Sequence, residues 1–209
     1  MINVCLADNY PVVHYGVKSY FRDHPEISVV SNVSNFYMVP DALRNKQIDV
    51  LVIDLELEGL KSIYEIKAII NKFPTTKILV FSSLNEQIYA PNAIKAGAAG
   101  YVHKSVKLES LGISIVRVHQ GLVMLSESLK RNLALISKQN KSERVYRKLS
   151  NREVEVLRFL SEGKKNNEIS RILDLNEKTI STYKLRLLQK LDVNNIVDLI
   201  NKAKTLDIV

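Results

Sequence analysis

Two kinds of segment alternate along the first part of the chain. Short apolar and β-branched runs, typical of strands, occur at Ile2–Ala7, Ser28–Asn32, Val50–Asp54, Lys77–Phe81 and Gly100–Val102. Amphipathic stretches with helical spacing separate them, at Pro11–Asp23, Val39–Asn45, Ile63–Lys72, Glu86–Ala96 and Leu108–His119. The third and fourth runs are continuously apolar, as expected of parallel strands that are covered on both faces. Because parallel strands need crossover helices, the pattern predicts a flavodoxin-like, doubly wound α/β domain with a five-stranded parallel sheet.

The last part of the chain has helical spacing throughout. The pattern predicts a helix that follows Leu149 and stops at Gly163, and then helices at Asn166–Leu173, Glu177–Leu191 and Ile196–Leu206. Ser150 and Glu153 have the spacing of a capping box, and Asn176 is the expected N-cap of the third helix. Two short helices joined by a tight turn, the second polar and basic outside, are typical of a helix-turn-helix. We therefore predict an all-α, four-helix helix-turn-helix domain, with an ordinary bundle that has a solvated basic face as the alternative.

Charge separates these two parts. The 209 residues include 30 Lys and Arg against 22 Asp and Glu, a net charge of +8. Residues 1–126 carry a net +1, residues 127–147 a net +4 and residues 148–209 a net +3. The middle piece is polar and loses apolar periodicity near Ser137, which predicts a helix that frays into a linker. We therefore expect domains at 1–122 and 148–209 joined by a linker helix and linker at 123–147. The alternative is a solvated surface helix within one domain.

Composition narrows the classes of protein. No apolar run reaches the about 18 residues of a membrane span, and the first residues carry no basic leader. The one cysteine, Cys5, excludes an internal disulfide and a multi-cysteine metal site. We expect a cytoplasmic protein with no membrane contact. The excess of positive charge allows a nucleic-acid partner without proving one.

Polar residues follow several of the predicted strands. Asp8 and Asn9 come after the first, Asp54 ends the third, Ser82 follows the fourth and Lys104 follows the fifth. Ligands of open parallel sheets bind beyond the carboxyl ends of the strands, so we expect these side chains to gather there. Carboxylates suit Mg²⁺, whereas hydroxyl and ammonium groups suit phosphoryl oxygens. A central carboxylate can also be the nucleophile that forms an acyl phosphate.

This set of residues resembles that of response-regulator receiver domains over roughly residues 1–122, and the segment Ala96–Lys104 is close to the NarL/FixJ branch. The resemblance implies that Asp54 accepts a phosphoryl group from a sensor histidine kinase or a small phosphodonor. It also implies that Ser82 and Lys104 contact the phosphoryl group and that Tyr101 is the switch aromatic residue.

The resemblance also implies a Mg²⁺ site. Its ligands would be Asp8, Asp54 and the backbone carbonyl of Glu56, with Asn9 as a weak ligand. Asn9 stands where the family has a second acid, and Glu58 stands where it has proline. Two interpretations therefore stay open. Either Asp54 is phosphorylated with a weakened Mg²⁺ dependence, or the pocket has drifted and abundance, a partner or a ligand sets the output.

The last part of the chain resembles the LuxR-type DNA-binding domain over residues 148–209. The likeness rests on Leu149–Leu157, Gly163, Asn166, Lys178–Ser181 and the pair Lys190-Leu191. The stretch Lys178–Lys184 followed by Arg186-Leu187 is similar to the EvgA/BvgA branch. The resemblance implies contacts to double-stranded DNA from Lys165, Asn166, Lys178, Thr179, Ser181, Thr182, Tyr183, Lys184 and Arg186.

Together these features predict a two-component response regulator that binds promoter DNA as a homodimer. Phosphorylation at Asp54 would control dimerisation and DNA binding, and the apolar face of the last helix could dimerise. One alternative is a DNA-binding regulator that works without phosphorylation. A phosphatase with an aspartate nucleophile is less favoured, because it leaves the basic domain unexplained and needs an acid/base group that Asn9 cannot supply. We therefore expect no enzymatic activity.

Overall fold

The computed structural model describes residues 1–127, 129, 149–206 and 208–209. The chain divides into two compact units, Met1–Asn132 and Leu133–Val209. Most of the segment expected to be the linker, 123–147, lies outside the described residues, so the predicted fraying helix and the domain boundaries stay predictions. In the described ranges, no helix has the length and apolar character that crossing a membrane requires.

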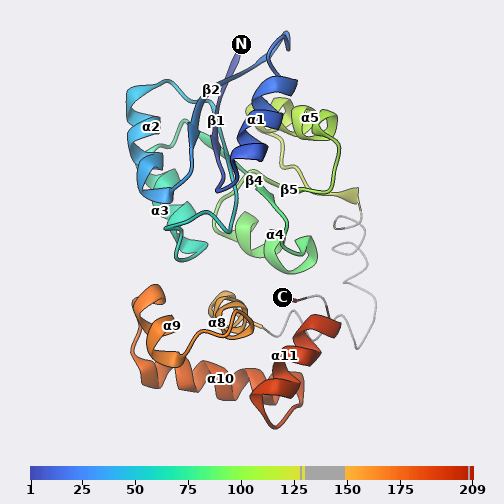
Figure 1. Cartoon of the computed structure of the whole chain (residues 1–209). Helices are drawn as coiled ribbons and strands as arrows, with labels where there is room; N and C mark the ends of the chain where they lie inside the picture. The colour runs from blue at the N-terminus through green and yellow to red at the C-terminus, as the bar shows by residue number, and fades with distance from the viewer. Residues whose placement is uncertain (128, 130–148, 207) are drawn as a thin grey trace. The chain divides into compact units, whose positions relative to one another are not determined.

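The first unit is a parallel sheet flanked by helices (Figure 1). Its strands are β1 (Ile2–Ala7), β2 (Ile27–Val33), β3 (Val50–Ile53), β4 (Lys77–Ser82) and β5 (Gly100–His103), in the order β2-β1-β3-β4-β5. Its helices are α1 (Pro11–Tyr20), α2 (Val39–Asn45), α3 (Tyr64–Lys72), α4 (Glu86–Lys95) and α5 (Leu108–His119), with the 3-10 helix η1 at Phe36–Met38. All four strand pairs are parallel, which confirms the predicted doubly wound α/β fold.

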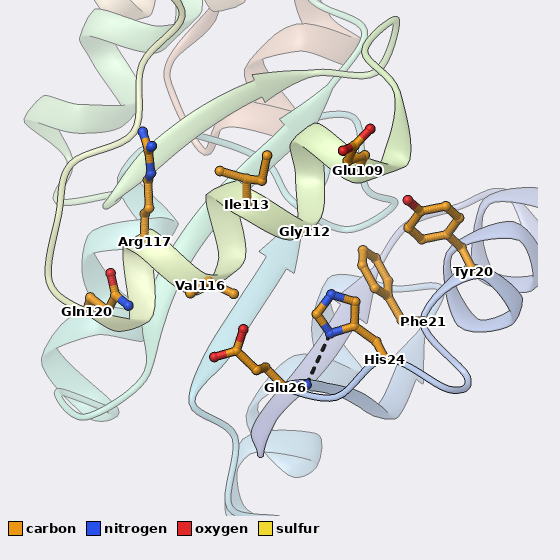
Figure 2. Close-up of a pocket in the computed structure, with 10 residues that line it drawn as sticks. All are labelled: Tyr20, Phe21, His24, Glu26, Glu109, Gly112, Ile113, Val116, Arg117 and Gln120. Carbon is orange, nitrogen blue, oxygen red and sulfur yellow. Dashed lines mark hydrogen bonds between the residues drawn. The ribbon is translucent and has the colours of Figure 1, made fainter.

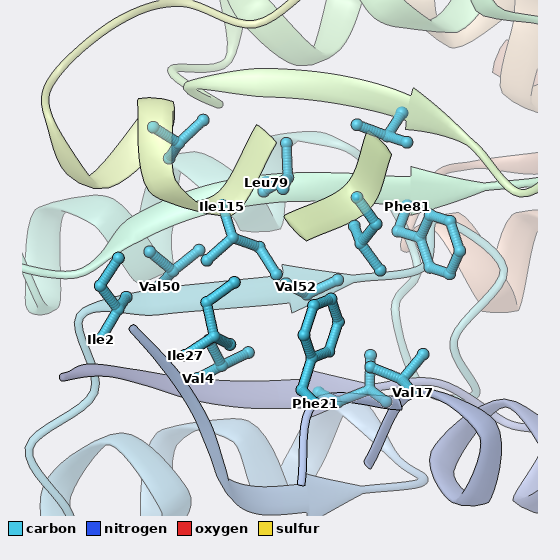
Figure 3. Close-up of a cluster of buried hydrophobic side chains, with 14 residues drawn as sticks. Ile2, Val4, Val17, Phe21, Ile27, Val50, Val52, Leu79, Phe81 and Ile115 are labelled. Carbon is cyan, nitrogen blue, oxygen red and sulfur yellow. The ribbon is translucent and has the colours of Figure 1, made fainter. Parts of the chain in front are cut away.

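Helices α1 and α5 pack on one face of the sheet. Phe21 at the end of α1 and Ile115 on α5 lie in a buried cluster with Val4, Val52 and Leu79 from the strands (Figure 3). The two helices approach closely at Gly112, where an added Cβ would lie 3.0 Å from the ring of Phe21. Helices α2 and α3 lie on the opposite side of the sheet (Figure 1). This two-sided cover explains why β3 is buried along its whole length.

The chain after α5 adds a short pairing to the edge of β5. The N–H of Met124 donates to the carbonyl of Ala99, and the N–H of Tyr101 donates to the carbonyl of Met124, both at 2.9 Å. A Cβ at Gly100 would lie 2.8 Å from the Met124 carbonyl oxygen, so the pairing requires glycine there. Ser126 Oγ also donates to Glu86 Oε1 on α4 at 2.7 Å. Residues 124–126 are therefore attached to the first unit.

The second unit consists, in its described part, of the helices α8 (Asn151–Ser161), α9 (Asn166–Leu173), α10 (Glu177–Leu191) and α11 (Ile196–Thr205). Buried side chains from all four form its core, among them Leu157, Ile169, Ile180, Leu187 and Leu199. The predicted capping box is present: the N–H of Ser150 donates to Glu153 Oε2 at 2.6 Å, and the N–H of Glu153 donates to Ser150 Oγ at 3.3 Å. The predicted all-α helix-turn-helix unit is confirmed.

Candidate functional sites

Two buried carboxylates lie at the carboxyl end of the sheet. Asp8 follows β1 and Asp54 follows β3, and each is only 1% exposed. The strand pairing places them together, because the N–H of Asp54 donates to the carbonyl of Ala7 at 2.9 Å. On the other side, the N–H of Asp8 donates to the carbonyl of Val33 at 3.0 Å. The sheet itself therefore holds two negative charges that water does not solvate.

Lys104, which follows β5, lies between the two carboxylates. Its Nζ is 2.5 Å from Asp54 Oδ2, to which it donates a hydrogen bond, and 2.6 Å from Asp8 Oδ2. Burial lowers the pKa of this ammonium, but the contacts with Asp54 and Asp8 outweigh burial and raise the pKa above its ordinary value. The contact with Asp8 Oδ2 is an ion pair without hydrogen-bond geometry, so this buried oxygen keeps acceptor capacity.

Asn9 links the loop after β1 to the loop after β3. Its Nδ2 donates to the carbonyl of Glu56, and its Oδ1 accepts from the N–H of Glu58, both at 2.6 Å. A carboxylate at this position could accept from Glu58 but could not donate to Glu56. The side-chain amide of Asn9 is therefore hydrogen-bonded to the backbone carbonyl of Glu56, which the family resemblance assigns as a Mg²⁺ ligand.

The oxygen atoms around Asp8 are suited in part to bind Mg²⁺. Two carboxylates, one with a buried oxygen that lacks a hydrogen bond, are suitable hard ligands. The carbonyl of Glu56 already accepts a hydrogen bond from Asn9, which competes with a metal for this oxygen. Among the described residues, no group of three His, Cys, Asp or Glu side chains is arranged to hold a metal.

Ser82 and Tyr101 both form hydrogen bonds with the backbone of Leu84. Ser82 is fully buried at the end of β4, and its Oγ accepts from the N–H of Leu84 at 3.4 Å. The Tyr101 hydroxyl donates to the carbonyl of Leu84 at 2.6 Å. Burial raises the pKa of Tyr101, so the phenol stays protonated and keeps this bond. The backbone of Leu84 therefore links the side chains of Ser82 and Tyr101.

Helices α9 and α10 form the helix-turn-helix. Asp174 ends α9 with a φ of 52°, in the left-handed conformation, and Asn176 Oδ1 accepts from the N–H of Lys178 at 2.8 Å to begin α10. Asn166 Nδ2 donates to Ser181 Oγ at 3.2 Å and ties the start of α9 to α10. The predicted turn and N-cap are therefore present, and Asn166 lies beside α10.

The predicted DNA-contacting residues divide into two groups on the structure. Lys165, Lys178, Ser181, Thr182 and Arg186 are exposed, whereas Asn166, Thr179, Tyr183 and Lys184 are half-buried. The exposed face of α10 also contains Leu185 and Gln189, which were not among the residues predicted from the sequence. Their spacing of seven and eleven residues from Lys178 is the signal that could have found them.

Comparison with known protein families assigns both units. Residues 4–116 match the model of the response regulator receiver domain, and residues 147–203 match that of the bacterial regulatory proteins of the luxR family. The chain belongs to the NarL/FixJ-type response regulators. It is a two-component transcription regulator, with a receiver unit that contains the acidic pocket and a LuxR-type unit that contains α10.

Relatives of this response regulator match it over nearly its whole length. The Fimbriae Z protein of Escherichia coli K12 is 30% identical over 99% of this chain and 98% of that protein. Response regulator UvrY of the same strain is 28% identical over 97% of this chain and 94% of that protein. RcsB of Salmonella enterica serovar Typhimurium, solved on the promoter rprA with the phosphomimetic BeF3⁻, is 29% identical with a TM-score of 0.79, over 97% of this chain and 98% of that one.

The receiver unit of this response regulator also has a groove between α1 and α5 (Figure 2). Tyr20 lies on one side of it, and Ile113, 48% exposed, lies on the other. Glu26 and Glu109 give the groove two acidic groups, and Arg117 gives it a basic one.

Proposed function

We propose that this response regulator accepts a phosphoryl group on Asp54 from a sensor histidine kinase and then binds promoter DNA as a homodimer through α10. The observation that carries the proposal is the cluster of Asp54, Lys104 and Ser82. A buried carboxylate lies there against one cation, and a buried hydroxyl ends the neighbouring strand β4. These are the groups that a carboxylate nucleophile and a dianionic phosphoryl group need around them.

The chemistry follows from this placement. An oxygen of the Asp54 carboxylate attacks phosphorus, the bond from phosphorus to the phosphohistidine nitrogen breaks, and its electron pair leaves with the imidazole. Lys104, which already lies against Asp54, pairs with the phosphoryl oxygens. Asp8 and Asp54 would hold Mg²⁺, which neutralises phosphoryl charge when it is bound. The chain therefore acts as a phosphoryl acceptor and switch, without turnover of an external substrate.

Replacing Asn9 by aspartate should tighten Mg²⁺ binding roughly tenfold or more. The change adds a carboxylate and frees the carbonyl of Glu56, and both effects favour a hard divalent cation. Isothermal titration calorimetry with MgCl₂ measures the dissociation constant. Asn9→Ala is the matched control, because it frees the carbonyl without adding charge and should give a smaller gain. Equal Mg²⁺ titrations of wild type and Asn9→Asp would contradict the assignment of this site.

We propose promoter binding on two grounds. Helix α10 presents Lys178, Ser181, Thr182 and Arg186 to solvent on an element of the size that fits the major groove. The RcsB relative was solved on promoter DNA, and other RcsB structures are described as dimers on DNA. The α1–α5 groove and the exposed Val197 on α11 are surfaces that a homodimer could use. We place the protein in the cytoplasm, where promoter DNA lies.

The stretch Lys178–Lys184 followed by Arg186-Leu187 supports a finer placement. We propose that the output unit belongs near the EvgA/BvgA branch of the family, on the basis of this sequence alone.

Replacing Lys178 by alanine tests the DNA-binding helix. Lys178 is exposed at the start of α10, where recognition helices contact base edges. We expect the variant to bind a duplex selected by the wild-type protein about 1–3 kcal/mol more weakly, in gel-retardation titrations at several salt concentrations. Lys204→Ala is the charge-matched control, since Lys204 is exposed on α11 and should matter less. An equal loss of DNA affinity in both variants would mean that Lys178 contributes only through its positive charge.

A further inference from the structure

Leu185 is an exposed apolar side chain on the face of α10 that the proposed function turns toward DNA. It is 60% exposed, and it lies seven residues after Lys178 and four before Gln189. Since an α-helix has about 3.6 residues per turn, these three side chains project in nearly the same direction. The core side chains Leu187 and Ile180 project from the opposite side. Leu185 therefore makes no contribution to the core of its unit.

The two hydroxyl groups beside Leu185 are already engaged as hydrogen-bond donors. Ser181 Oγ donates to the carbonyl of Glu177 at 3.1 Å, and Thr182 Oγ1 donates to the carbonyl of Lys178 at 2.9 Å. Their hydroxyl protons are thus used within the helix itself. Reading of the bases at the centre of this face must therefore include contacts other than hydroxyl donation.

The major groove presents one apolar group at its base edges, the C5-methyl of thymine. We propose that Leu185 is a specificity-determining residue that packs against a thymine methyl in the operator, which rests on the proposed binding of DNA through α10. Burying the leucine against a methyl group removes apolar surface of both from water. The same side chain gains nothing against cytosine, which lacks the methyl group. Leu185 thus favours thymine at one position of each half-site.

The experiment uses the full-length protein and a duplex selected by it from a random library. Thymines in that duplex are replaced one at a time by deoxyuridine, which removes the methyl and leaves base pairing intact. With the wild-type protein, uracil at one position in each half-site should weaken binding by about fourfold, the value of one buried methyl. In Leu185→Ala, overall binding should fall by roughly tenfold, and thymine and uracil should become equivalent at that position.

Leu122→Ala is the matched control, since Leu122 is 53% exposed after α5 of the receiver unit and its loss should keep the thymine preference. Thermal melting should be the same for all three proteins, which separates a lost contact from a lost fold. Specific binding with no thymine–uracil difference, or a difference that persists in Leu185→Ala, would overturn the assignment of Leu185. If the wild-type protein selects no duplex sequence, the proposed DNA-binding function fails, and this inference fails with it.

Discussion

Replacing Asp54 by alanine should abolish phosphorylation of the protein. Asp54 is the buried carboxylate to which Lys104 donates, and an alanine side chain would leave no oxygen nucleophile at that place. Incubation with radiolabelled acetyl phosphate and excess MgCl₂, followed by gel electrophoresis, measures the label. Wild type should be labelled and Asp54→Ala should not. Asp23→Ala is the control, because Asp23 is an exposed acid of the same unit and its loss should leave labelling unchanged.

The same pair of proteins tests how the output is controlled. If phosphorylation drives the switch, acetyl phosphate should raise the DNA affinity and the dimer fraction of wild type, by gel retardation and light scattering, and change neither in Asp54→Ala. Radiolabel on Asp54→Ala would mean that a residue other than Asp54 accepts the phosphoryl group. A footprint that is the same for both proteins with and without acetyl phosphate would instead establish the regulator that works without phosphorylation.

Replacing Glu153 by glutamine should destabilise the output unit by about 2 kcal/mol. Glu153 Oε2 accepts from Lys190 Nζ at 2.7 Å and so joins the start of α8 to the end of α10, in addition to its place in the capping box. Glutamine keeps the shape and an acceptor for the cap but removes the anion. Because Lys190 is partly exposed, water recovers some of the lost interaction, and the expected cost lies below that of a fully buried pair. Denaturant unfolding followed by circular dichroism measures it.

The difference in stability between the wild-type protein and Glu153→Gln should disappear at acid pH. Burial raises the pKa of Glu153, but Lys190 and Ser150 outweigh burial and bring it below its ordinary value. A lowered pKa in the folded state gives stability above the unfolded pKa of about 4.3 that is lost as the pH falls through the folded value. The wild-type protein and Glu153→Gln should therefore converge in stability as the pH falls from the unfolded pKa of about 4.3 through the lower folded value.

Glu168→Gln is the matched control for this pair. Glu168 also accepts a capping hydrogen bond, from the N–H of Lys165 at 2.7 Å, but it is exposed. Its replacement should cost much less than that of Glu153. Equal costs for the two variants would mean that the contact with Lys190 adds nothing to stability.

The sequence predicts the elements well because their signals are local. The bounds of β1, α2, α5, α9 and α10 agree with the structure to the residue. Helix α1 ends at Tyr20, three residues before its predicted end. In the turn that follows, His24 Nδ1 accepts from the N–H groups of Glu26 and Ile27, where β2 begins. Nothing in the helical periodicity shows this side-chain contact. Cys5 on β1 is fully buried, and burial raises the pKa of its thiol to about 11.

The candidate sites are predicted less completely, because they depend on where side chains point. The resemblance brings Asp8, Asp54, Ser82 and Lys104 to one edge of the sheet, and the structure places them there. The resemblance does not show that the Asn9 amide donates to the Glu56 carbonyl, since this hydrogen bond depends on the distance between two loops. The roles of these residues stay predictions until the variants above are measured.

The pairing of Met124 with β5 has a consequence for how copies of this chain meet. Sheet edges with open backbone groups invite strand-to-strand aggregation, and at the β5 edge the chain itself takes up backbone positions at Ala99 and Tyr101. At the other edge, β2 has a bulge at Val30, whose carbonyl accepts from the ammonium group of Lys46. A charged lysine and an irregular ladder discourage pairing there as well. Both edges of the sheet are therefore protected, which disfavours strand-to-strand association between copies of this chain.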